Sequence, residues 1–271
     1  MYPARLLALV LALIPLAAPA AAQGPLTAGV PAQGSINGQL DEDIWTVGGV
    51  SPGDTLILAA KNLGPGGFTP EFYLTGPAQF DSLYMTTSTS ALSRIKVTES
   101  GTFQLRAKAA MFSTFVGTYE VQVLKVPGAF TVPANDQGGA IGEGATVTGQ
   151  APAGDPDPWT FAACAGATVR ILLSEVPPNA SNQFNPAFQL YNPSGTLVES
   201  AASTTIADIT TLPLQAAGTY TVVVYGALGG NTGAADYSLT VTGMCGATPP
   251  PVSKLDSYTT AMNTPLSIAA P

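Results

Sequence analysis

Apolar and polar residues alternate at every second position in several short segments of the chain. Residues 101–108 (GTFQLRAK), 119–125 (YEVQVLK) and 237–242 (YSLTVT) each show this pattern. A period of two places one row of side chains on a core and the other in water, which is typical of half-buried β-strands. In 119–125 this puts Glu120 and Gln122 on the solvent side. Outside the N-terminal segment, no stretch shows a convincing helical period.

The same order of segments occurs twice along the chain. SINGQLDEDIWT (35–46) is answered by ATVTGQAPAGDPDPWT (145–160), so that a Gly-Gln pair precedes an acidic turn and a Trp-Thr pair in each. FTPEFYLTGP is answered by FNPAFQLYNPSG, and ESGTFQLRAKA by AAGTYTVVVYG. Trp45 thereby matches Trp159, and Tyr119 matches Tyr237. Matching segments in the same order indicate a tandem repeat of one domain.

These patterns predict an all-β chain of two tandem antiparallel β-sandwich domains, at residues 26–126 and 140–246. Abundant Gly and Pro between short segments rich in Val, Thr and Ser fit strands joined by turns. Residues 127–139, rich in Pro, Gly and Asn, are the expected linker.

The N-terminus has the features of an export signal. A basic start is followed by an apolar run and then by Ala20–Ala22, small residues of the kind that a signal peptidase reads. We predict a signal peptide at residues 1–22 and a secreted or cell-surface chain. The apolar run is too short to span a bilayer comfortably, and no span is expected in the mature chain. The formal net charge of −8 disfavours nucleic acid as a partner.

The order Gly-Gln, Asp-x-Asp-x-Trp-Thr-Phe, Pro-x-Phe-x-Leu-Tyr, Ala-Gly-Thr-Tyr and Tyr-x-Leu-x-Val resembles the bacterial pre-peptidase C-terminal domain. The second copy, roughly residues 140–243, matches well, and the first, roughly 26–126, is more degenerate. The resemblance implies small jelly-roll-like sandwiches, found as accessory modules of secreted enzymes and surface proteins. Some such modules bind calcium or polymeric substrates. No peptidase sequence is present in this chain.

Residues 247–271 read as a Pro-rich joint followed by a first strand. Asp256, Tyr258 and the run Asn263–Leu266 resemble the start of a bacterial cadherin-like or immunoglobulin-like repeat. The sequence therefore predicts a truncated third domain, as in a fragment of a longer surface protein. The alternative is an ordinary flexible tail.

The chain offers little catalytic chemistry. It contains no His, which removes Ser-His and Cys-His nucleophile systems and most zinc sites. The paired carboxylates Asp41 and Asp43 recur as Asp155 and Asp157 at the same place in the second copy, which favours a turn role over an active site. We expect a non-enzymatic chain without a cofactor. These four Asp residues are weak calcium candidates, since calcium takes six to eight oxygen ligands and neither turn alone supplies them.

Two further features bear on function. Cys164 and Cys245 are the two cysteines, and in an exported chain they favour a disulfide that closes a loop of about 80 residues; two separate thiols are the alternative. Phe112 and Phe115 have no counterparts in the second copy and are candidate exposed aromatics.

Two roles stay open: a structural or adhesive module of a surface protein, or an accessory that binds carbohydrate or another substrate for a secreted hydrolase or peptidase. An extracellular protein or polysaccharide is the expected partner.

Overall fold

The computed structural model describes residues 21–112, 116–176, 184–227 and 236–245. All of its regular structure is β-strand, which confirms the predicted fold class, and within these residues no helix could cross a membrane. The predicted signal peptide, apart from Ala21 and Ala22, and the predicted third domain lie outside the described residues.

The first sandwich is built from nine strands: β1 (Ala21–Pro25), β2 (Ala32–Ile36), β3 (Glu42–Val50), β4 (Thr55–Asn62), β5 (Pro70–Thr75), β6 (Ser82–Thr86), β7 (Ser90–Lys96), β8 (Gly101–Ala109) and β9 (Gly117–Val126). They form a five-stranded sheet in the order β1-β3-β8-β5-β6 and a four-stranded sheet in the order β2-β9-β4-β7. Strand β1 pairs in parallel with β3, and the other pairs are antiparallel. Strand β1 lies just before residues 26–126, the range predicted for the first domain.

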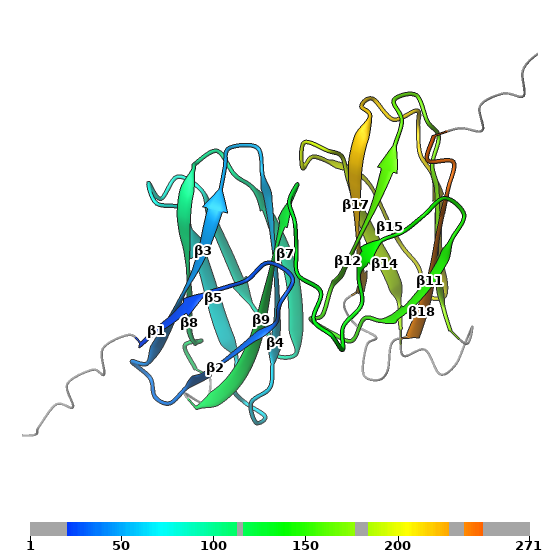
Figure 1. Ribbon diagram of the computed structural model, residues 1–271. Helices are drawn as coiled ribbons and strands as arrows, with labels where there is room; N and C mark the ends of the chain where they lie inside the picture. The colour runs from blue at the N-terminus through cyan, green and yellow to red at the C-terminus, as the bar shows by residue number, and fades with distance from the viewer. Residues whose placement is uncertain (1–20, 113–115, 177–183, 228–235, 246–271) are drawn as a thin grey trace, which may run out of the picture.

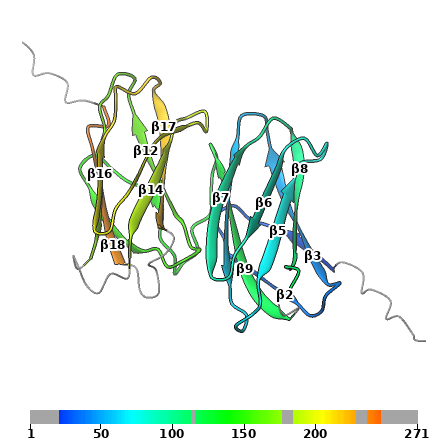
Figure 2. The same cartoon turned by 180° about the vertical axis from the view of Figure 1, so that it is seen from behind.

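The second sandwich repeats this plan strand for strand. Its strands are β10 (Gly139–Ala140), β11 (Thr146–Gln150), β12 (Asp157–Ala163), β13 (Arg170–Glu175), β14 (Pro186–Tyr191), β15 (Leu197–Ala202), β16 (Ile206–Thr210), β17 (Gly218–Gly226) and β18 (Asp236–Thr242). The five-stranded sheet has the order β10-β12-β17-β14-β15, and the four-stranded sheet β11-β18-β13-β16. Strand β10 is again parallel to its neighbour. Figures 1 and 2 show the two sandwiches side by side.

Each sandwich encloses its own hydrophobic core between its two sheets. Trp45, Phe72 and Tyr119 are buried in the first core, and Trp159, Phe188 and Tyr237 in the second. The alternation in 101–108 is confirmed: Phe103 and Leu105 are fully buried, whereas Gln104 and Arg106 face solvent.

A third apolar cluster joins the two sandwiches. Ile57 and Leu124 point outward from the four-stranded sheet of the first sandwich and pack against Tyr191 and Val223 on the five-stranded sheet of the second. All four side chains are fully buried. Burial of such a side chain contributes about 1.5–3 kcal/mol, so this contact, which we call the junction, is a substantial interface.

The burial of Gln122 corrects one expectation from the sequence. Gln122 was expected in water, but it is 1% exposed, and its Nε2 donates a hydrogen bond to the Gly29 carbonyl at 3.0 Å. Its strand, β9, has one face in the core of the first sandwich and part of the other beneath the second sandwich. Alternation assigns the inner face correctly but gives no information about what covers the outer one.

Candidate metal site and junction groove

A buried chain of three side chains occurs in both sandwiches. In the first, Trp45 Nε1 donates to Tyr119 Oη at 2.9 Å, and Tyr119 Oη donates to Asp43 Oδ2 at 2.7 Å. In the second, Trp159 Nε1 donates to Tyr237 Oη at 2.8 Å, and Tyr237 Oη donates to Asp157 Oδ2. The second Asp and the Trp of the repeated acidic motif are therefore joined through the Tyr of the last strand.

A glycine makes room for the Tyr hydroxyl in each copy. Gly34 lies opposite Tyr119, and Gly149 lies opposite Tyr237. A Cβ at Gly34 or Gly149 would lie 2.3 or 2.4 Å from the hydroxyl oxygen. This corrects the sequence alignment: the counterpart of Gly149-Gln150 is Gly34-Ser35, whereas Gly38-Gln39 lies in the turn that follows β2. The repeated dipeptide suggested the wrong match because only the strand pairing shows which glycine faces the tyrosine.

In the first sandwich the two candidate calcium ligands are satisfied by the protein itself. Asp43 Oδ1 accepts a hydrogen bond from Gln23 Nε2 on β1, and Oδ2 accepts one from the Ser35 amide at 3.2 Å. Asp41 closes its own turn by accepting the Asn37 amide at 2.7 Å. Among the described residues, no cluster of potential ligands contains Asp41 or Asp43.

The second sandwich treats the matching carboxylates differently. Asp157 is fully buried, and its Oδ1 has no hydrogen-bond partner; Oδ1 of Asp155 is likewise buried and unpartnered. Asp136, from the linker, joins them, and a carboxylate oxygen from each of the three lies within 4.8 Å of the others. Asp136 follows a turn closed by its amide and the Pro133 carbonyl, Asp155 lies in a similar turn after Pro152, and Asp157 begins β12.

The electrostatics of this cluster disfavour three free carboxylates. Burial raises the pKa of Asp157 to about 9; the hydrogen bond from Tyr237 opposes this effect, whereas the negative charges of Asp136 and Asp155 and a hydrogen bond with the Asp136 carboxyl group add to it. Burial also raises the pKa of Asp155 to about 6, with the charges of Asp136 and Glu120 contributing and Lys61 opposing. A bound cation would reverse this balance, since it favours the ionised form of each ligand.

The donor set fits a hard divalent cation. All three side chains offer oxygen, with no sulfur or nitrogen ligand among them, and oxygen ligands suit calcium. Oδ1 of Asp157 accepts no hydrogen bond from a donor group and could bind a cation. The matching Oδ1 of Asp43 accepts a hydrogen bond from the side-chain amide of Gln23. Sequence reasoning found Asp155 and Asp157 but missed Asp136, because a ligand from the linker becomes visible only once the linker folds back. The acidic residue within the Pro- and Gly-rich linker was the available signal.

The disulfide expected from the sequence is present in the structure. Cys164 follows β12, and Cys245 follows β18, with the two Cα atoms 4.7 Å apart. The Cys164 amide also donates to the Met244 carbonyl at 2.9 Å. Glu143 accepts the amides of Gly243 and Met244 at 2.7 Å each, so the end of the second sandwich is held at several points.

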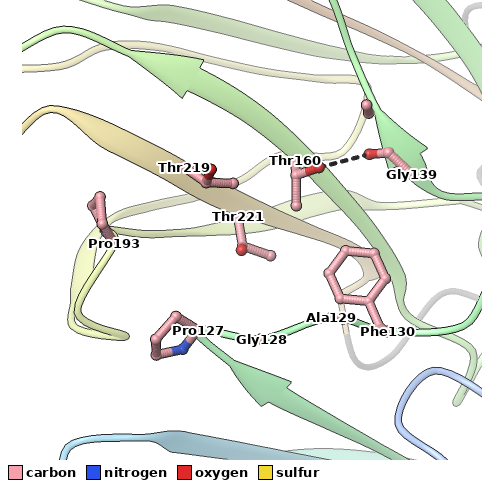
Figure 3. Close-up of a pocket in the computed structure, with 10 residues that line it drawn as sticks. Pro127, Gly128, Ala129, Phe130, Gly139, Thr160, Pro193, Thr219 and Thr221 are labelled. Carbon is pink, nitrogen blue, oxygen red and sulfur yellow. Dashed lines mark hydrogen bonds between the residues drawn. The ribbon is translucent and has the colours of Figure 1, made fainter.

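A shallow groove of about 640 Å³ lies where the linker leaves the first sandwich (Figure 3). Phe130 and Pro127 of the linker form one side, and Thr219 and Thr221 on β17 line the other, with Thr160 on β12 nearby. None of the described residues that line it is ionisable. Such a surface suits a neutral ligand with both apolar and hydroxyl groups. Phe112 is 96% exposed but lies outside this groove, and Phe115 lies outside the described residues.

No family model and no curated protein matches the chain. Among solved structures, it is similar to the pre-peptidase C-terminal domain of a collagenase from Bacillus anthracis, with 19% identity over 40% of this chain and 96% of that one, at a TM-score of 0.31. It is also similar to tandem CBM51 modules of a family 98 glycoside hydrolase from Streptococcus pneumoniae, with 8% identity over 73% and 79% of the chains and a TM-score of 0.26. The CUB1-EGF-CUB2 region of human MASP-1/3 shows 10% identity over 78% and 99%, at 0.23. Similarities at this level carry no information about activity or ligands.

Proposed function

We propose that the chain is a non-catalytic, calcium-binding structural module of an exported surface protein. One observation carries the proposal. The two sandwiches share the same buried Asp-Tyr-Trp chain, but where Gln23 satisfies Asp43, the matching oxygen of Asp157 is unpartnered and faces two further carboxylates. A buried carboxyl group in this setting is costly to ionise, and a bound cation would offset that cost.

Two other features support this role. The Cys164–Cys245 disulfide is typical of oxidising compartments outside the cytosol. The absence of His from the sequence removes the most common general base, and the buried Asp157 accepts a hydrogen bond from Tyr237, whose hydroxyl in turn accepts one from Trp159. The proposal extends to a tandem of pre-peptidase C-terminal-like domains that hold or display neighbouring parts of a longer surface protein.

The direct test is to remove bound metal with a chelator, add calcium, and measure the heat of binding by calorimetry and the Tm by thermal unfolding. We expect a higher Tm in millimolar calcium, because ligand at about 100 times its Kd stabilises the folded state by about 2.7 kcal/mol. Asp136→Asn removes a ligand, keeps the Trp159–Tyr237 and Tyr237–Asp157 hydrogen bonds of the buried chain, and should abolish most of this shift. Asp41→Asn, at the matching acidic turn of the first sandwich, is the control and should retain it. An unchanged Tm and no binding heat for the wild-type chain would refute the proposal.

A second candidate function is binding of a neutral polysaccharide, as in an accessory module of a secreted hydrolase. The observation that favours it is the groove of Figure 3, which combines an aromatic ring with threonine hydroxyls and lacks charge. Phe130→Ala and Thr221→Val should then weaken retention on neutral polysaccharide columns, whereas the distant Phe112→Ala should not. Equal retention of all three variants and the wild type would exclude the groove as a carbohydrate site.

A further inference from the structure

The turn that carries Asp155 is wedged against the first sandwich. Gly154 adopts φ +83°, and a Cβ at this position would lie 3.0 Å from the Ala60 carbonyl oxygen and 3.0 Å from Lys61 Cβ. Gly154 and Asp155 also line a cleft with residues 90–92 of β7. One of the three proposed metal ligands therefore lies at the contact between the sandwiches.

Charges from the first sandwich face the same place. Lys61 on β4 and Glu120 on β9 are opposite each other in the four-stranded sheet. The negative charge of Glu120 contributes to the raised pKa values of Asp136 and Asp155, whereas Lys61 acts in the other direction on Asp155. Without a cation, Glu120 adds a further negative charge beside the three acidic side chains, and Lys61, which contacts the 152–156 turn, supplies the positive charge there, so like charges oppose close contact of the sandwiches at this end of the junction.

The opposite end of β4 is held to the second sandwich by hydrogen bonds. Thr55 Oγ1 donates to the Gly195 carbonyl at 2.6 Å, and Lys96 Nζ donates to Thr196 Oγ1 at 2.7 Å. Between the two ends lies the apolar cluster around Ile57. Strand β4 thus runs the length of the junction. Its Thr55 end is held by hydrogen bonds and packing, and its Lys61 end lies beside the turn that carries Asp155.

We propose that cation binding at Asp136, Asp155 and Asp157 fastens the charged end of the junction and so fixes the arrangement of the two sandwiches. This inference rests on the proposed calcium site. The cation binds one carboxyl group each from the linker, the 152–156 turn and β12. Its two positive charges offset the repulsion between Glu120 and these carboxyl groups. By thermodynamic linkage, a well-formed junction must in turn raise the affinity of the site for the cation.

The test uses the full chain with and without calcium, after chelation. We measure hydrogen exchange by mass spectrometry in residues 88–92, which contain no metal ligand, and the radius of gyration by X-ray scattering. For the wild type, we expect several-fold slower exchange in 88–92 and a smaller radius in calcium. Asp136→Asn should show neither change. Glu120→Gln, which removes the facing charge but no ligand, should exchange slowly even without calcium and respond less to it.

The outcomes separate the two proposals. If calcium binds and raises the Tm, but exchange in 88–92 and the radius stay the same, the junction inference is wrong and the calcium site stands. If Glu120→Gln responds to calcium as fully as the wild type, the electrostatic account is also wrong. If calcium does not bind at all, both proposals fall together.

Discussion

Replacing Gly149 by Ala should severely destabilise the second sandwich. The added Cβ would lie 2.4 Å from Tyr237 Oη and 2.5 Å from Tyr237 Cζ, well inside contact distance. Tyr237 cannot move aside freely, because its hydroxyl donates to Asp157 and accepts from Trp159, and its ring is fully buried. The substitution therefore adds volume to a packed core and disrupts a buried hydrogen-bond chain at the same time.

The cost can be worked out from these two effects. Overpacking a core costs about 1–3 kcal/mol, and leaving a buried polar partner unsatisfied costs about 1–3 kcal/mol. Since strand β11 can give way somewhat at the sheet edge, we expect a total of about 2–4 kcal/mol. For a domain of this size, each kcal/mol lowers the Tm by about 4–8 °C, so the second sandwich should unfold about 8–32 °C lower.

Gly142→Ala is the matched control for this experiment. It introduces the same methyl group into the same sandwich, but at a position where a Cβ would meet nothing within 4 Å. We expect its stability to stay within about 0.5 kcal/mol of the wild type. Both variants are compared by thermal and urea unfolding in the presence of calcium. If Gly149→Ala melts within about 2 °C of Gly142→Ala, the close approach of Tyr237 does not constrain this position and the reasoning fails.

Three further predictions concern other parts of the molecule. Replacing Cys164 and Cys245 together by Ala should cost about 2–5 kcal/mol, because an 81-residue separation is no longer closed in the unfolded chain; equal urea midpoints for both proteins would contradict this. Thr55→Val should cost about 1–3 kcal/mol by leaving the Gly195 carbonyl unsatisfied in the junction, whereas Thr55→Ser should not. Asp81 has a lowered pKa: burial pushes it up, but hydrogen bonds from the Thr98 and Glu99 amides outweigh burial. Its contribution to stability is therefore present above the unfolded pKa of about 3.9 and is lost as the pH falls through the lower folded value. The loss of unfolding free energy in Asp81→Asn, relative to the wild type, should shrink below about pH 4. A loss that stays constant between about pH 3 and 7 would argue against this reasoning.

The sequence predicted those parts of the fold that depend on local pattern. Alternation in 101–108 and 237–242 identified β8 and β18, and the repeated Trp and Tyr residues marked matching core positions in the two sandwiches. The pairing of two cysteines in one copy predicted the disulfide. These features could be read from the chain because spacing along a strand fixes which face a side chain occupies.

The parts that were missed depend on contacts between distant segments. Ile57 looks like an ordinary outward position of a strand until the second sandwich covers it, and Gln122 looks the same until the Gly29 carbonyl binds its side chain. Asp136 looks like a linker residue until the chain folds back beside β12. Gly38-Gln39 was aligned wrongly because a repeated dipeptide carries no information about which residue lies across the sheet. In each case the deciding neighbour is remote in sequence, and no period of two or of 3.6 encodes it.

The different partners of Asp43 and Asp157 have a consequence for how the two copies can evolve. After a duplication, both sandwiches inherit a buried carboxylate whose outer oxygen needs a partner, and the chain supplies one of them with the amide of Gln23. The first copy therefore carries its own partner, whereas the second, under the calcium proposal, takes its partner from the medium. A single side chain on β1 would then be enough to make the stability of one copy independent of calcium while its twin responds to it.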